Sequence, residues 1–420
     1  MSPVDGAWLR MDSATNPMVI NVVLLLDGAV PHADLAELLR ERLLPHARFR
    51  RRVVPSPAPL VPARWEEDPC FDLATHLHRA ALPSPSNEAA LQEMVGDLMS
   101  APLPSDRPLW QVHHVEGFEG GSVLVARVHH AVGDGVALVK LLLHLTDDGA
   151  PGRKAPPSVG LAPERPKDPL RYAKLAGAKA LSLGRMLALP VDPPSAIRGP
   201  IGVRKKVAWS RPFDVAQLKG AAHARSAKLN DLVVASVGGA LREYLAERGG
   251  VPEGLRALVP VYVRGHQKEG AELGNHFGLV YLPLPVHMEG IDDRIAHARR
   301  TMDDLKRAPD ALAAMAVLAA MGMASQGIQR LGIDIFTRKA SLLLTNVPGP
   351  TEHLHLLGRR LSSVLVWAPV SGDVALGVTL LSYAGSMRLG VSADARVVQD
   401  PEAIVAAFEG VVERTLAAVA

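Results

Sequence analysis

Residues 129–135 read His-His-Ala-Val-Gly-Asp-Gly, and their types and spacing are suited to chemistry. A hydroxyl or an amine becomes a strong nucleophile only when a base removes its proton as it attacks. Imidazole, with a pKa of about 6.5, can do this near neutral pH. The motif therefore predicts acyl transfer to a hydroxyl or an amine, with His130 as the general base. His129, one position earlier on an extended chain, points the opposite way and is expected to support the loop by packing or hydrogen bonding.

Asp134 and Gly135 are expected to shape this loop. Asp134 would brace it through an ion pair or backbone hydrogen bonds, and Gly135 would let substrate or backbone approach closely at the start of the next helix. Such a histidine pair can also be purely structural, or bind a metal together with the aspartate. His113-His114 lacks an Asp-Gly at the right offset and is assigned no role. No HExxH motif or cysteine cluster is present, so no metal is expected.

The elements around the motif place it where a strand ends. Residues 122–128 are apolar and β-branched, which predicts a buried strand, and residues 136–145 predict a helix. Catalytic side chains are common at such strand ends, because a rigid scaffold holds the loop. The rest of the first part, 1–146, also alternates: a strand is predicted at 18–26, and helices at 32–44 and 89–99.

Residues 147–206 form a predicted crossover of different character. Ten prolines fall between 151 and 200, which excludes regular core elements from most of it. Between 161 and 206 there are ten Lys or Arg against three acidic residues, and 170–189 is a proline-free helical stretch. The segment is either a solvated linker or a basic amphipathic helix that rests on an anionic membrane surface.

The second part, 207–420, again mixes strands and helices. Strands are predicted at 258–263, 277–284 and 341–346, a hairpin at 376–392, and helices at 232–245 and 401–418. Asn230 is either an N-cap of the first of these helices or an oxyanion donor over His130. Residues 311–329 carry no charge, and predict a buried or surface-docking helix rather than a membrane span.

Composition excludes several classes of protein. Apolar residues make up 48% and charged residues 21%, which is typical of a globular protein, and a net charge of +3 argues against nucleic-acid binding. Cys70 is the single cysteine, so no intrachain disulfide can form, and a reducing, cytoplasmic compartment is expected. The N-terminus lacks the apolar core of a signal peptide.

Taken together, the motifs resemble the bacterial wax ester synthase/diacylglycerol acyltransferase family over nearly the whole chain. The resemblance rests on the opening Met1–Ser13, on Trp65–Leu73, on Pro108-Leu-Trp110, on the 129–135 motif, on Asn230-Asp231 and on Asn346-Val-Pro-Gly-Pro350. The 129–135 motif alone is shared with peptide-synthetase condensation domains, whereas the ordered set is much more specific.

The resemblance implies an α/β fold of two chloramphenicol-acetyltransferase-like lobes, with mixed sheets flanked by helices and an active-site tunnel between them. It implies direct attack on the thioester of acyl-CoA by a diacylglycerol or a long-chain alcohol, with His130 as base and release of free CoA. Trp110, Asp231 and Asn346 become candidate substrate-binding residues, although Trp110 can equally pack under the loop and Asn346 can form a turn. Asp12, a further candidate for substrate binding, stands where the family often has Glu, and a different chain-length preference is expected if this position shapes the acyl pocket.

No resident cofactor is expected, because acyl-CoA is a co-substrate. Without a P-loop or GxGxxG motif, its phosphates need scattered basic residues, and Arg204, Lys205 and Lys206 are the candidates. The acceptors predict a peripheral position on the inner membrane face or on lipid droplets, and a homodimer is allowed. Two alternatives stay open: a condensation-type enzyme that uses a carrier-bound thioester, and a non-catalytic lipid-surface protein with the same fold.

Overall fold

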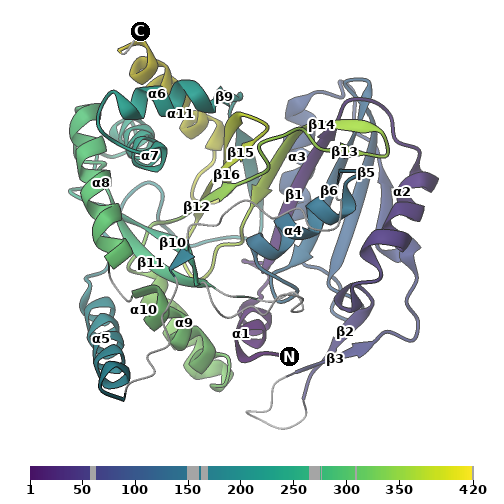
Figure 1. The fold of residues 1–420 in the computed structure, drawn as a ribbon, viewed down its shortest axis with the longest axis horizontal. Coiled ribbons are helices and arrows are strands. Elements are labelled where there is room, and N and C mark those ends of the chain that lie inside the picture. Colours follow the sequence, from purple (N-terminus) through teal and green to yellow (C-terminus); the bar gives the residue numbers. More distant parts are fainter. Residues whose placement is uncertain are drawn as a thin grey trace.

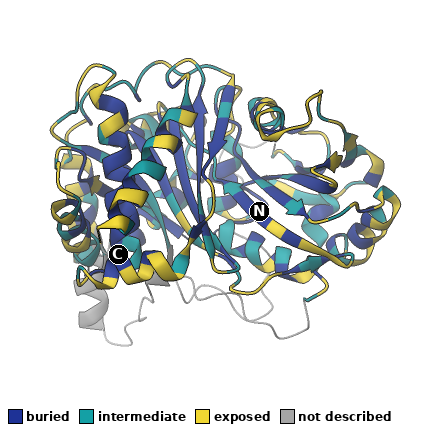
Figure 2. Ribbon diagram, turned by 90° about the horizontal axis from the view of Figure 1, so that it is seen from above, coloured by how far each residue is buried: buried dark blue, intermediate teal, exposed yellow. Residues whose placement is uncertain are grey.

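In a computed structural model, the chain forms two large β-sheets that lie side by side, with helices packed around them (Figure 1). The structure describes residues 1–56, 63–148, 160–161, 169–263, 275, 277–307 and 310–418. Buried strands occupy the middle of each lobe, and the helices expose their outer sides (Figure 2). The predicted α/β fold with mixed sheets and flanking helices is confirmed.

The first sheet carries the strand that ends at the histidine motif. Its strands, in spatial order, are β13 (His355–Leu356), β14 (Arg359–Trp367), β1 (Val19–Leu26), β6 (Gly121–His129), β5 (Trp110–Phe118) and β4 (Leu77–Ala80). Around it lie α2 (His32–Leu38), α3 (Glu88–Ser100), α4 (Gly135–Leu145), the 3-10 turns Ala47–Phe49 and Leu73–Thr75, and the hairpin of β2 (Arg51–Val54) and β3 (Arg64–Glu67). The helix predicted at 32–44 changes to a π-helical turn at Leu39–Leu43.

The second sheet is larger and mixed. Its strands, in spatial order, are β11 (Phe277–Leu284), β10 (Leu255–Val263), β12 (Leu342–Pro348), β15 (Leu376–Tyr383), β16 (Ser386–Asp394) and β8 (Lys205–Trp209), with β7 (Gly160–Leu161) beside β10 and β9 (Phe213–Asp214) beside β16. Apolar sides of α6 (Val215–His223), α7 (Leu229–Ala246), α8 (Ile291–Arg307) and α11 (Pro401–Ala417) share one core with these strands. The predicted hairpin forms β15 and β16, and Ala384 and Gly385, with φ of 47° and 79°, make its turn.

The two lobes do not divide the sequence at residue 207, as the predicted boundaries assume. β13 and β14 come from the second part of the chain but belong to the first sheet, where β14 pairs with β1. Trp367 on β14 contacts Trp209 on β8, with ring centroids 5.8 Å apart, inside an apolar cluster that both lobes share. This exchange fixes the lobes to each other because an isolated first lobe would expose the edge of β1.

The uncharged stretch 311–329 is not one helix. It forms most of α9 (Asp310–Met321) and the start of α10 (Gln326–Thr337), with a break at residues 322–325. At the break, a Cβ on Gly322 would lie 1.8 Å from the Pro3 carbonyl oxygen, so glycine allows α1 (Pro3–Met11) to approach this end of α9. Among the described helices, which include α5 (Pro169–Ala188), none is long and apolar enough to cross a membrane.

Candidate active site

His130 directly follows β6, and backbone pairing fixes its position. Its N–H donates to the carbonyl of Met18 at 2.7 Å, which continues the antiparallel register of β1 and β6 by one residue. The side chain is only 5% exposed. Because the hydrogen bonds between β1 and β6 hold its backbone, the imidazole projects from a rigid position.

Asn275, on the loop before β11, anchors the imidazole from the second lobe. His130 Nδ1 lies 2.9 Å from Asn275 Oδ1, while Asn275 Nδ2 donates to the His130 carbonyl and to Asp5 Oδ1, both at 2.8 Å. The two acceptors around Nδ2 fix the orientation of the amide. Its oxygen can only accept, so Nδ1 carries the ring proton and Nε2 holds the lone pair. This is the tautomer that a base acting through Nε2 needs.

Asp5 and Arg48 complete the network. Arg48 lies 3.2 Å from the buried carboxylate of Asp5, and its guanidinium also donates to the carbonyls of Ala131 and Val132 at 2.9 and 3.1 Å. α1 begins at a Ser2 cap, and its helical spacing places Asp5 and Trp8 on one side. The ion pair therefore ties α1 to the loop that carries His130.

Aromatic rings enclose the imidazole. Trp8 stacks on His130 with centroids 4.1 Å apart and an interplanar angle of 14°, and the ring of Phe277 lies 5.5 Å away. Burial lowers the pKa of His130, while the negative charge of Asp134 and the hydrogen bond to Asn275 oppose this shift. Because the pKa of His130 is lowered, its imidazole is neutral at neutral pH, as a general base requires.

His129 points away from this network and shapes the turn. Its Nδ1 accepts a hydrogen bond from the Ala131 N–H at 3.0 Å, and its Nε2 lies 3.9 Å from Asp12 Oδ1. Burial and the adjacent His130 lower the pKa of His129 to about 3, so it stays neutral. Asp12 accepts from the Met18 N–H at 2.6 Å, and burial raises its pKa. Asp12 thus lies beside the motif, against β1.

Asp134 and Gly135 form the start of α4. Asp134 is its buried N-cap, and its Oδ1 accepts from the Ala137 N–H at 3.0 Å. A Cβ added at Gly135 would meet no atom within 4 Å apart from its chain neighbours and its own helix backbone, so no other described part of the protein approaches closely there. The open space beside Gly135 is compatible with a bound substrate.

Asn230 and Asn346 meet in the second lobe. Asn346 Nδ2 donates to Asn230 Oδ1 at 2.9 Å. Of the two roles considered for Asn230, the N-cap is wrong: α7 starts at Leu229, its N-cap is Lys228, and the buried Asp231 accepts from the Lys228 N–H at 2.9 Å. Asp231 is therefore structural, which corrects its assignment to substrate. No hydrogen bond among the described residues joins the asparagine pair to His130.

Trp110 is a core residue rather than a substrate contact. It is 1% exposed, stacks on His76 with centroids 4.6 Å apart, and donates its indole N–H to the Phe49 carbonyl at 2.8 Å. The His129 N–H bonds to the carbonyl of the preceding Leu109 at 3.0 Å. The Pro-Leu-Trp motif therefore stabilises the loop that carries His130, through the Leu109 backbone and the packing of Trp110.

The three basic candidates for CoA phosphates do not form one site. Lys205 is buried, and its ammonium lies 2.6 Å from Asp394 Oδ2 and 3.1 Å from the Gly202 carbonyl. Lys206 donates to the Gln399 carbonyl, and only Arg204, at the limit of ion-pair distance from Glu93, is largely exposed. A buried, paired ammonium cannot bind a phosphate without leaving Asp394 uncompensated, so the assignment of Lys205 is corrected.

Two cavities lie elsewhere in the described part of the molecule. One, of about 450 Å³, opens between α6, α8 and the end of the chain, near Arg225 and Asp292. The other, of about 30 Å³, lies between the sheets beside Asn16 and Lys205. Neither is lined by His130, so the tunnel stays a prediction. Residues 264–274 and His276, on either side of Asn275, lie outside the described residues.

Sequence reasoning missed Asn275, Asp5, Arg48 and Trp8. Asn275 stands in Gly-Asn-His-Phe-Gly, and nothing in this local pattern marks the asparagine as the partner of His130. Asp5 and Trp8 both belong to the opening Met1–Ser13 motif, which was the one available signal for them. Arg48 had none, because its ion pair joins segments without a shared pattern.

The structure is a two-lobed fold with a buried histidine at a strand end between the two mixed sheets, an arrangement suited to acyl transfer. Residues 1–235 match the wax ester synthase/diacylglycerol acyltransferase catalytic domain, and residues 273–414 match the WS/DGAT C-terminal domain. The chain therefore belongs to the wax ester synthase/diacylglycerol acyltransferase family.

Individual relatives agree with this assignment. The chain is 28% identical to a probable diacylglycerol O-acyltransferase of Mycobacterium tuberculosis, over 99% of this chain and 96% of the relative. Its fold is similar to that of a wax ester synthase/diacylglycerol acyltransferase from Marinobacter aquaeolei, with a TM-score of 0.73 and 22% identity over all of both chains. The first condensation domain of the calcium-dependent antibiotic synthetase shares the fold at a TM-score of 0.62 and 18% identity, over 100% of this chain and 94% of that one.

Proposed function

We propose that this enzyme transfers a long-chain acyl group from acyl-CoA to the hydroxyl of a diacylglycerol or a long-chain alcohol. The observation that carries the proposal is the hydrogen bond between His130 Nδ1 and Asn275 Oδ1, since it leaves Nε2 ready to accept a proton. The apolar surroundings of Trp8 and Phe277 suit an aliphatic substrate and exclude water, which would otherwise compete as acceptor.

In the proposed reaction, His130 Nε2 takes the proton of the acceptor hydroxyl while its oxygen attacks the thioester carbonyl. The carbonyl oxygen becomes an oxyanion, then the C–S bond breaks, and the imidazolium returns the proton to the thiolate, which gives an ester and free CoA. No acyl-enzyme is needed. This fits the exposed position of Cys70, which has no histidine partner among the described residues.

Asn230 remains the candidate donor to the oxyanion. Its Oδ1 is occupied by Asn346, so its amide hydrogens stay available for another acceptor. In this proposal Asn346 positions Asn230, and substrate closes the space between that pair and His130.

Product analysis tests the proposal. Palmitoyl-CoA alone, and then with a mixture of hexadecanol and dioleoylglycerol, would be given to the purified chain, with free CoA and lipid products measured. We expect CoA release only with an acceptor, in equal amount to the ester formed. Release without an acceptor would mean a thioesterase, and activity with an acyl-carrier protein but not with acyl-CoA would favour the condensation-type alternative. Vesicle binding without turnover would favour the non-catalytic alternative.

The pH dependence follows from the environment of His130. Its pKa is lowered by burial, and only the neutral imidazole can act as base. We therefore expect kcat/KM to be retained as the pH falls through the ordinary imidazole pKa of about 6.5, and to be lost only at a lower pH. A pH profile of kcat/KM measures this, and an acid limb above the ordinary value would contradict it.

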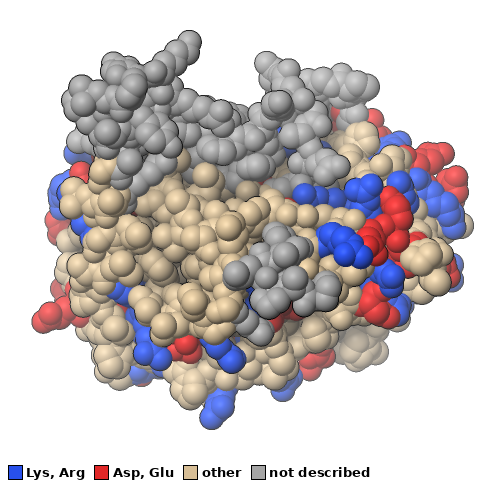
Figure 3. Space-filling model, turned by 90° about the horizontal axis from the view of Figure 1, so that it is seen from below, with Lys and Arg blue, Asp and Glu red and all other residues tan. Residues whose placement is uncertain are grey.

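α10 supports a peripheral position on a lipid surface. Ile328, Leu331 and Ile335 lie on one side of this helix and are 64%, 61% and 39% exposed. Seen from below, the molecule has a broad area without charged side chains, and α9, α10 and α1 lie at that end of the molecule (Figures 1 and 3). We infer that this apolar side inserts into the surface where the acceptors dissolve.

An Ile328→Ser/Leu331→Ser variant is expected to bind vesicles of phosphatidylcholine and dioleoylglycerol about 10-fold more weakly or worse, since each buried aliphatic side chain contributes about 1.5–3 kcal/mol. Vesicle co-sedimentation measures this. Val203→Ser is the matched control, because Val203 is 50% exposed but precedes β8 and lies outside α10. Equal binding of both variants and the parent would place the lipid contact elsewhere.

A further inference from the structure

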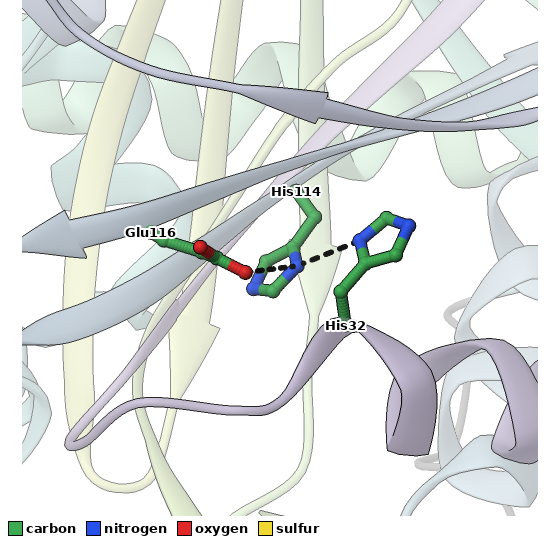
Figure 4. A group of neighbouring side chains, drawn as sticks. All are labelled: His32, His114 and Glu116. Atoms are coloured by element: carbon green, nitrogen blue, oxygen red, sulfur yellow. Dashed lines mark hydrogen bonds and ion pairs between the residues drawn. The ribbon is translucent and has the colours of Figure 1, made fainter.

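A cluster of potential metal ligands, separate from the candidate active site, lies on the first sheet (Figure 4). His32 is the first residue of α2, while His114 and Glu116 are alternate residues of β5 and project from the same face of the sheet. The two histidine Nδ1 atoms are 3.2 Å apart, and His114 Nδ1 lies 3.7 Å from Glu116 Oε1. The three ligand atoms all lie within 4.8 Å of one another. Neither the proposed reaction nor the family assignment uses these residues.

We propose that His32, His114 and Glu116 bind a divalent transition-metal ion such as zinc. Two imidazole nitrogens at about 2.0–2.1 Å from a tetrahedral zinc are roughly 3.3 Å apart, close to the separation already present. The Glu116 side chain is 51% exposed and can move toward the ion, whereas His114 is buried and fixed by its strand. Water would fill the fourth position. This proposal departs from the expectations from the sequence that the chain binds no metal and that His113-His114 has no role.

Without metal, the two imidazoles share a hydrogen bond, in which one Nδ1 carries a proton and the other accepts it. A metal ion would displace that proton. His114 Nε2 lies 3.4 Å from the Ser122 oxygen, which also accepts the Val30 N–H at 3.0 Å. When Nε2 of His114 carries the ring proton and donates it to Ser122, Nδ1 is left as the ligand atom. Hydrogen bonds from outside the metal site commonly orient metal-binding histidines in this way.

The charged side chains beside the two histidines are Arg79 and Glu116. Arg79 lies opposite His114 in the β4–β5 register, and its charge opposes a cation. The Glu116 carboxylate offsets that charge. A bound ion would hold the start of α2 to the middle of β5.

Calorimetric titration of the chelator-treated full chain, purified without a histidine tag, tests the site with zinc chloride as probe. We expect one saturable site, with affinity at least about 10-fold lower in His32→Ala and Glu116→Gln. His113→Ala is the matched control: His113 stacks on His78 at 5.1 Å, and no carboxylate completes a cluster there among the described residues. The partly exposed positions of His32 and Glu116 keep the variants folded.

Two further readouts separate a built site from surface histidines. Cobalt(II) should give visible absorption bands in the parent and in His113→Ala that are absent from His32→Ala. Saturating zinc should raise Tm by about 2 °C or more in the parent but not in His32→Ala. Equal affinity in His32→Ala and the parent, or no saturable binding, would overturn the proposal. Neither result would affect acyl transfer, so failure of the metal-site proposal can be distinguished from failure of the proposed function.

Discussion

Replacing His130 with alanine is expected to lower kcat/KM by about 10²- to 10⁴-fold, the range that a positioned general base contributes. The remaining site would still bind substrate, so most of the loss should fall on kcat. Turnover of palmitoyl-CoA with dioleoylglycerol or hexadecanol, followed through free CoA, measures the effect.

The controls for His130 address folding, because its ring is buried and stacked on Trp8. His130→Gln keeps much of the volume and a polar group for Asn275, but has no basic nitrogen, and should be as inactive as the alanine variant. His113→Ala removes a partly buried histidine from the neighbouring β5 and should retain activity. Parent-like turnover in both His130 variants, with unchanged thermal unfolding, would exclude His130 as the base.

Replacing Asn275 with alanine is expected to lower kcat by about 10²-fold with little change in KM. Without the amide oxygen, nothing holds the proton on Nδ1, and a share of the imidazole places it on Nε2, where the ring cannot act as base. A tautomer-inverting change in a serine protease costs about 10⁴-fold in kcat. A smaller loss of kcat is expected here, because removing Asn275 allows both tautomers of His130 and does not force the inactive one.

The pH profile distinguishes positioning from a merely structural role for Asn275. The hydrogen bond to Asn275 raises the pKa of His130 against the larger effect of burial, so its loss should move the acid limb of kcat to lower pH. A structural defect would reduce the active fraction without moving that limb. Asn21→Ala is the matched control, since Asn21 is also buried but, among the described residues, its side chain bonds only to the Val19 carbonyl on its own strand. An unshifted profile in Asn275→Ala would remove Asn275 from the mechanism.

Local patterns in the sequence identified many of the elements. The apolar runs that became β1, β6 and β11, and the hairpin of β15 and β16, were found because their side chains face buried layers and turn residues bound them. The helix expected at 311–329 divides in two where α1 approaches Gly322. The hydropathy of the segment indicates burial, but it contains no information about this contact. The pairing of β14 with β1 joins segments more than 300 residues apart, and no local pattern records such a partner.

The sequence by itself determined the family, the reaction class and the histidine at the end of β6, because these depend on residue types at short, ordered spacings. Only the tertiary structure decided the state of that histidine. Asn275 lies 145 residues beyond His130, and Asp5 and Arg48 come from two further segments. Folding brings these groups together, and their hydrogen bonds fix which imidazole nitrogen carries the proton. Burial likewise assigns Lys205 and Trp110 to the interior, since exposure depends on what packs over a residue and not on its type.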